Sequence, residues 1–114
     1  MASATAIAEE ITINIARLSR DVELPQESVA ATVRLLEEDN TVPFITRYRR
    51  DQTGGLDEQQ IGRIREALAR HRQLAERKQT ILRSIESQHK LTDSLREQIE
   101  RADSIKRLED LYLP

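Results

Sequence analysis

Apolar side chains recur along this chain at intervals of three, four and seven residues, the spacing that lines one face of an α-helix. The first such segment is residues 4–18, with the apolar positions Ile7, Ile11, Ile15 and Leu18. Residues 19–24 interrupt the pattern. Pro25 then suits the first turn of a second helix, where its missing N–H costs nothing, and this helix runs to about Glu38.

Turn signals divide the next part of the chain. Asp39-Asn40 ends the second helix, and we expect Asn40 to adopt the left-handed conformation that closes many helices. Thr41 is a suitable N-cap for a short helix from Pro43 to about Arg50. The buried side of that helix would carry Phe44, Ile45 and Tyr48. The strongest break in the chain follows at Thr53-Gly54-Gly55.

The dominant predicted element is a helix from Asp57 to about Gln88, which contains no proline. A heptad numbered from Ile61 gives a stripe that is apolar at both ends. The middle of the stripe is diluted by His71, Ala75 and Lys78. We therefore expect a long helix whose two halves pack on different partners, and not a uniform coiled coil.

After the turn at His89-Lys90-Leu91, Thr92 is a good N-cap for a further helix. This helix carries an apolar face of Leu95, Ile99 and Ala102. Asp103-Ser104 then caps a last short helix with Ile105, Leu108 and Leu111. We expect Leu108 and Leu111 to be buried. Tyr112 and Leu113 fall off that face, so we expect them to be exposed or covered by a neighbouring molecule.

Together these segments predict an all-α fold of five helices, with the helix of about 57–88 as its spine. Composition agrees, since Ala, Glu, Lys, Leu and Arg make up about 48% of the 114 residues, a share typical of long helices. We expect residues 1–114 to be a single helical domain and a fragment of a longer multidomain protein. The apolar run that ends at Pro114 supports the second expectation, because natural termini are usually polar.

Composition also excludes several classes of protein. No apolar run approaches the ~18 residues that a membrane span needs, and the N-terminus lacks the basic region and apolar core of a secretory signal. The chain has no Cys, which excludes disulfides, thiol catalysis and cysteine zinc sites and fits a cytoplasmic protein. We expect no contact with a membrane.

No catalytic constellation is found, so we expect no enzyme activity, no metal site and no cofactor. His71 and His89 would lie about 27 Å apart on a continuous helix, at 1.5 Å per residue, and cannot share a metal there. Gly54-Gly55 is followed by Leu56-Asp57, where a phosphate-binding loop needs Lys with Ser or Thr.

The net charge of −2 is unevenly distributed, because residues 47–90 carry +5 while residues 1–46 carry −5 and residues 91–114 carry −2. Arg63, Arg70 and Arg77 form one row at heptad spacing, and Arg65 and Arg72 form a second row on the other side of the apolar stripe. Their stems could cover the edge of the stripe while their heads meet water or acidic neighbours. Alternatively, they could form a ridge that tracks nucleic-acid phosphates.

A second basic cluster is Arg47-Tyr48-Arg49-Arg50, on a short helix that follows a helix and a tight turn. This arrangement is compatible with a helix-turn-helix, and Arg beside Tyr suits backbone contacts and base stacking. In the other interpretation Tyr48 is part of the core and the arginines form ion pairs. The candidate acidic partners are Glu37, Glu38, Asp39 and Asp51.

The segments TVPFITRYRR (41–50) and TGGLDE (53–58) resemble the N-terminal region of the Tex family of bacterial transcription accessory proteins. Leu35-Leu36, Lys90-Leu91-Thr92 and residues 108–114 match further landmarks of that family, so the resemblance covers most of the chain. The chain departs from the family pattern at four positions, where Asn40 replaces the usual Gly, Thr46 replaces Ala, Arg50 replaces Lys and Asp51 replaces Glu.

The resemblance implies a helix-turn-helix-like N-terminal module of a longer nucleic-acid-binding protein that acts in transcription. Members carry an RNase-H-like domain, helix-hairpin-helix elements and a C-terminal RNA-binding domain, to which their nucleic-acid affinity is mainly attributed. The implied partners are RNA or DNA, the further domains of the same protein and the transcription machinery. Candidate nucleic-acid contacts are Arg47, Arg49, Arg50, Arg63, Arg70 and Arg77. The alternative is an interaction scaffold that docks other domains or the machinery without touching nucleic acid.

Overall fold

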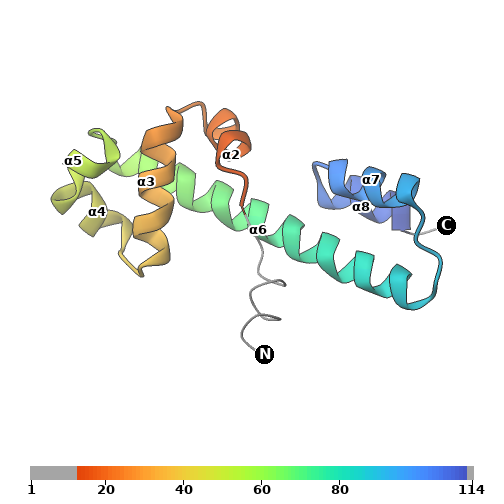
Figure 1. Cartoon of the computed structure of the whole chain (residues 1–114). Coiled ribbons are helices and arrows are strands. Elements are labelled where there is room, and N and C mark those ends of the chain that lie inside the picture. The colour runs from red at the N-terminus through yellow and green to blue at the C-terminus, as the bar shows by residue number, and fades with distance from the viewer. Residues whose placement is uncertain (1–12, 113–114) are drawn as a thin grey trace. The chain divides into compact units, whose positions relative to one another are not determined.

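The computed structural model describes residues 13–112, in which every regular element is a helix (Figure 1). The all-α prediction is therefore confirmed for this part of the chain. It contains seven helices and not the predicted five: α2 (Ile15–Val22), α3 (Gln26–Glu37), α4 (Val42–Tyr48), α5 (Arg50–Thr53), α6 (Glu58–Ser87), α7 (Asp93–Arg101) and α8 (Ile105–Tyr112). The sequence did not predict α5, a single turn after a break at Arg49, whereas α8 is the short last helix predicted after Asp103-Ser104.

The prediction of one helix over residues 4–18 is wrong within the described residues; its part up to residue 12 lies outside them. Asn14 is an N-cap in extended conformation, and its side-chain oxygen accepts a hydrogen bond from the Arg17 N–H at 3.0 Å. The helix then continues to Val22, which is buried, and ends at Glu23 in the left-handed region. A capping side chain inside the apolar repeat thus decided where the helix begins.

The end of α3 corrects the prediction for Asn40. The left-handed residue is Asp39, with a φ of 67°. The Asp39 N–H donates to the Leu36 carbonyl at 3.0 Å and the Asn40 N–H donates to the Leu35 carbonyl at 3.2 Å, which is the pattern of a Schellman motif. The Asn40 side chain also donates to the Leu35 carbonyl, at 2.8 Å. Asn40 therefore stabilises the turn through its amide group and not through its backbone conformation.

The long helix α6 begins with a capping box. The Gln60 N–H donates to Asp57 Oδ1 at 2.8 Å, and the Asp57 N–H donates to Gln60 Oε1 at 2.9 Å. Two backbone donors at the helix start are thereby satisfied reciprocally. The observed bounds, Glu58–Ser87, agree closely with the prediction of about 57–88.

The chain forms two compact units, divided along α6. The N-terminal unit, residues 13–71, contains α2–α5 and the first part of α6. Its core joins Leu18 of α2, Val29 and Val33 of α3, and Ile45 of α4 to Ile61 and Ile64 of α6. The last turn before α6 uses glycine for its conformation, because Gly54 and Gly55 have φ values of 79° and 86°.

The C-terminal unit contains the second part of α6 with α7 and α8. Its core includes Ile81 and Ile85 of α6, Ile99 of α7 and Leu108 of α8. The prediction that the two halves of the long helix use different cores is confirmed. N-caps at Thr92 and Ser104 are also confirmed, because Thr92 Oγ1 accepts from the Leu95 N–H and Ser104 Oγ accepts from the Arg107 N–H.

The chain end agrees with the expectation in part. Leu108 is fully buried, as predicted, whereas Leu111 is only half-buried. Tyr112 is also half-buried and packs against the core of its own unit, and its hydroxyl lies 3.2 Å from Ser84 Oγ. The prediction that Tyr112 is exposed or covered by another molecule is therefore wrong. The same prediction for Leu113 lies outside the described residues.

Candidate nucleic-acid interface

The basic cluster of residues 47–50 lies where α4 meets α5. The helix α4 starts because Thr41 Oγ1 accepts a hydrogen bond from the N–H three residues on, at 3.3 Å, and because Pro43 occupies the first turn. Val42 and Ile45 are buried in the core of the N-terminal unit. These two residues hold α4 in place and turn the basic cluster towards solvent.

Arg49 interrupts the helical path and is engaged by its neighbours. Its φ of −128° and ψ of 28° separate α4 from α5. The guanidinium carbon lies 5.0 Å from the centre of the Phe44 ring, a cation–π distance, and Nη1 donates to the Tyr48 carbonyl at 3.0 Å. The Phe44 and Tyr48 rings are 5.2 Å apart between centres and tilted by 49°. Arg49 is therefore tied to the aromatic pair.

Tyr48 is not in the core, since 57% of its surface is exposed. The prediction that it shares a buried side with Phe44 and Ile45 is wrong for Tyr48, whereas Ile45 is fully buried and Phe44 half-buried. Val42 and Ile45, three residues apart, form the buried line of α4. Tyr48 follows Phe44 by one turn along the edge of the helix, and α4 ends there.

Arg47 and Arg50 are exposed. In the part of the chain that the structure describes, neither guanidinium has an acidic partner, and Arg49 has none either. The ion pairs proposed from the sequence with Glu37, Glu38, Asp39 or Asp51 are thus not formed within residues 13–112. The surface formed by Arg47, Tyr48, Arg49 and Arg50 is called the α4 surface below.

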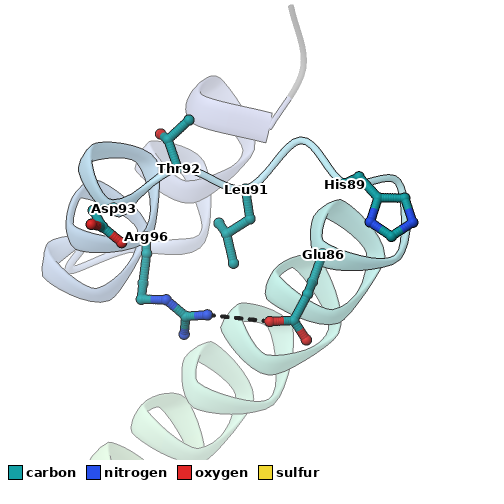
Figure 2. A pocket seen from close by; sticks show the side chains of 6 residues that line it. All are labelled: Glu86, His89, Leu91, Thr92, Asp93 and Arg96. Carbon is teal, nitrogen blue, oxygen red and sulfur yellow. Dashed lines mark hydrogen bonds and ion pairs between the residues drawn. The ribbon is translucent and has the colours of Figure 1, made fainter.

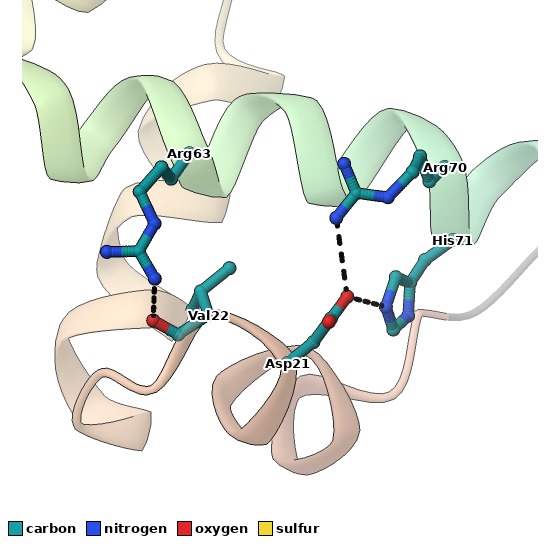
Figure 3. Close-up of polar contacts among 5 residues, drawn as sticks. All are labelled: Asp21, Val22, Arg63, Arg70 and His71. Carbon is teal, nitrogen blue, oxygen red and sulfur yellow. Dashed lines mark hydrogen bonds and ion pairs between the residues drawn. The ribbon is translucent and has the colours of Figure 1, made fainter.

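Arg63 and Arg70, in the same unit, contact the end of α2 (Figure 3). The Arg63 guanidinium donates to the carbonyl of Val22, at the end of α2. A cation at this position complements the free carbonyls of a helix C-terminus. Arg70 Nη2 lies 3.5 Å from Asp21 Oδ2, and His71 Nε2 lies 3.0 Å from the same oxygen. These contacts fasten the last turn of α2 to α6.

The carboxyl group of Asp21 responds to this environment. The hydrogen bond with His71 is the main cause that lowers the pKa of Asp21, and Arg70 contributes in the same direction. No sequence signal identified Asp21, because it lies 50 residues from His71 along the chain.

Arg77 belongs to the C-terminal unit. It forms a forked pair with Glu109 of α8, with Nε to Oε1 at 2.7 Å and Nη2 to Oε2 at 3.2 Å. The hydrogen bonding raises the pKa of Arg77 and lowers the pKa of Glu109. The guanidinium carbon also lies 5.8 Å from the centre of the Tyr112 ring. Arg77 thereby connects α6 to α8.

The six arginines predicted as nucleic-acid contacts therefore fall into two groups. Three lie on the α4 surface, and Arg63, Arg70 and Arg77 have partners within their own units. Whether any of the six contacts nucleic acid stays a prediction. In the second row of arginines predicted on the long helix, Arg65 is exposed.

A shallow cavity of about 340 Å³ lies in the C-terminal unit, between the end of α6 and the start of α7 (Figure 2). Arg96 reaches from α7 to Glu86 on α6, at 3.4 Å, across an apolar floor at Leu91. His89 and Asp93 also line it. Charges of both signs surround this cavity, so its lining does not favour an anionic ligand.

Within the described residues 13–112, no group of three or more His, Asp or Glu side chains is arranged to hold a metal ion. None of the helices in this part of the chain is long and apolar enough to cross a membrane.

Comparison with known proteins gives consistent matches. Residues 9–86 match the Tex-like protein N-terminal domain. The chain is 50% identical over 103 residues to transcriptional accessory protein Tex of Neisseria gonorrhoeae, covering 90% of this chain and 14% of that protein. It is 50% identical over 97 residues to protein YhgF of Escherichia coli, covering 85% of this chain and 12% of that protein.

A more distant match is S1 RNA-binding domain-containing protein 1 of Homo sapiens, 26% identical over 116 residues, which covers 99% of this chain and 12% of that protein. The chain thus spans about one-eighth of the length of the relatives it matches. The family match extends over more than half of the chain and includes α2–α5 and nearly all of α6. The chain belongs to the Tex-like protein N-terminal domain family.

Proposed function

We propose that this Tex-like domain contributes nucleic-acid contacts to a transcription accessory protein through its α4 surface. The observation that carries the proposal is the exposed Tyr48 beside two exposed arginines, Arg47 and Arg50, that have no acidic partner within residues 13–112. Unpaired guanidinium groups bind phosphates without first giving up an internal ion pair. The names of two relatives, a transcriptional accessory protein and an S1 RNA-binding domain-containing protein, support this direction.

In this proposal α3 and α4, joined by the tight turn at residues 38–41, act as a helix-turn-helix-like pair. The domain is non-catalytic and works in the cytoplasm with the transcription machinery and with further domains of the same protein. The contacts are to phosphates of RNA or DNA and are not specific for sequence. Arg63, Arg70 and Arg77 would contribute only if their heads left the partners described above.

The engagement of those three arginines favours a second candidate, in which the domain is a protein-interaction scaffold that makes no nucleic-acid contact. Their contacts hold helices together and leave fewer cations for a ligand. Salt-dependent binding separates the two candidates. Binding through phosphates weakens steeply as salt rises, because bound counterions are released from the nucleic acid.

The test compares the parent chain with the double variant Arg47→Gln/Arg50→Gln, by fluorescence anisotropy of a labelled mixed-sequence strand across a salt series. Each phosphate contact contributes about 0.7 to the slope of log K against log salt on a single strand, so we expect the slope to fall by about 1.4. The control Arg17→Gln/Arg65→Gln removes the same charge from two exposed positions elsewhere. Equal losses in the two variants, or no binding by the parent at low salt, would reject the α4 surface.

A further inference from the structure

We infer that Tyr48 is a stacking platform for a nucleobase, so that the α4 surface selects single-stranded over duplex nucleic acid. This inference rests on the function proposed above and adds the class of ligand to it. Among the residues the structure describes, Tyr48 is the large apolar side chain with the greatest exposure. A single exposed apolar side chain is ordinary on a protein surface, but Tyr48 lies in a cluster with the exposed Arg47 and Arg50. Aromatic rings beside cations are the combination that binds single strands.

The ring of Tyr48 is held in a defined place although it is exposed. Phe44 supports it at 5.2 Å between ring centres, with a tilt of 49°. Phe44 is half-buried and one turn earlier on α4, next to the buried Ile45. A ring supported in this way loses little conformational freedom when a base stacks on it. Base–aromatic stacking tolerates any sequence, because every base has a π-face.

Arg49 is the positioning residue of this platform and not a phosphate contact. Its guanidinium covers the Phe44 ring at 5.0 Å, and its Nη1 donates to the Tyr48 carbonyl at 3.0 Å. Both contacts fix the backbone at the end of α4, where Tyr48 lies. The sequence makes the three arginines equivalent candidates, whereas in this inference only Arg47 and Arg50 contact phosphates.

Selection of single strands follows from the chemistry of the two ligands. The faces of bases in a duplex are already stacked on their neighbours, and only the phosphates remain open to Arg47 and Arg50. A single strand offers phosphates and a free base face together. Tyr48 therefore adds affinity for a single strand and nothing for a continuous duplex of equal length.

The chain allows a direct measurement, because it has no Trp and only two Tyr residues. In the Tyr112→Phe background Tyr48 is the only tyrosine, and excitation above the absorption of phenylalanine reports on it alone. We expect a base-bearing single strand to quench its fluorescence, and an abasic strand of the same backbone length to leave it unchanged. Affinities are measured in parallel by anisotropy with three labelled ligands: the base-bearing strand, the abasic strand and a duplex.

The parent should bind the base-bearing strand about 5- to 150-fold more tightly than the abasic strand, the range expected for one stacked base. Tyr48→Ser should remove this preference and leave the salt slope unchanged, since the arginines stay. Tyr48→Phe keeps a ring and should retain the preference. Arg49→Lys keeps the charge but not the planar fork, so it should reduce the preference without changing binding of the abasic strand.

The outcomes separate the two proposals. If the abasic and base-bearing strands bind equally, or Tyr48→Ser retains the preference, the stacking inference is wrong while phosphate binding stands. If no ligand binds at low salt, the proposed function fails and the inference fails with it. Circular dichroism checks that each variant is folded, which is expected for Tyr48→Ser because the side chain is exposed.

Discussion

In the turn after α3, glycine should raise stability at one position and lower it at the next. Asp39 has a φ of 67°, a conformation that costs most L-residues about 1–2 kcal/mol and Asp somewhat less. Asp39→Gly removes this strain, but the greater conformational freedom of glycine in the unfolded chain reduces the gain in stability by roughly 0.5–1 kcal/mol. An acidic side chain at a helix C-terminus is also unfavourable. We expect a net gain of about 0.5–1 kcal/mol.

Asn40→Gly should have the opposite sign. It removes the 2.8 Å hydrogen bond from the Asn40 side chain to the Leu35 carbonyl, worth about 0.5–1.5 kcal/mol. Glycine adds its entropic cost of roughly 0.5–1 kcal/mol, with no strain to relieve, because Asn40 has an ordinary φ. The expected loss is about 1–2.5 kcal/mol. Urea unfolding followed by circular dichroism measures both variants.

Asp39→Ala is the matched control for charge. It removes the carboxylate but not the strain, so it should be less stable than Asp39→Gly. Hydrogen exchange of the Asp39 and Asn40 amides, which donate to Leu36 and Leu35, localises the effect to this turn. If Asn40→Gly is as stable as the parent and Asp39→Gly is not, the left-handed residue is Asn40 and the geometry described here is wrong.

Three further predictions concern other parts of the chain. Gly62 lies inside α6 with open space around an added methyl group, so Gly62→Ala should stabilise by about 0.5–1 kcal/mol. Gly54→Ala should destabilise, because the φ of Gly54 is 79° and the added methyl group would lie 2.9 Å from a serine hydroxyl. Thermal melting measures the sign of both effects. The pKa of Asp21 is lowered from its ordinary 3.8 in the folded chain. The ionised carboxylate therefore contributes stability above pH 3.8, and this contribution is lost as the pH falls through the lower folded pKa. Asp21→Asn should make the free energy of unfolding depend less on pH in the acid range, and an unchanged dependence would contradict this. Arg77→Gln should weaken hydrogen-exchange protection of α8 because Glu109 loses its forked partner, with Arg83→Gln on the same helix as an exposed control that should leave α8 unchanged.

Local signals in the sequence predicted most of the helices. Thr41, Thr92 and Ser104 cap helices as expected, and the bounds of α3 and α6 agree with the prediction within a residue or two. These features depend on residues three or four apart, which interact within one turn. The capping box of Asp57 and Gln60 follows the same local rule and could have been predicted from its spacing.

Features that depend on distant residues could not be predicted in this way. The partner of His71 and Arg70 is Asp21, about 50 residues away, and Arg63 meets a backbone carbonyl of α2. Backbone acceptors leave no trace in a pattern of side chains. For the same reason, heptad spacing placed Arg63, Arg70 and Arg77 in one row without showing that each one has a different task.

The sequence left two interpretations of Tyr48 open, one in the core beside ion-paired arginines and one on a ligand surface with Arg47, Arg49 and Arg50. The exposure of Tyr48 contradicts the first interpretation, and within residues 13–112 the three arginines have no acidic partner. The break at Arg49 ends α4 at Tyr48, and the buried line of Val42 and Ile45 fills the core without it. The exposure of Tyr48 therefore follows from its position on α4 relative to these two buried residues, and it leaves an aromatic ring in the basic cluster open to a ligand.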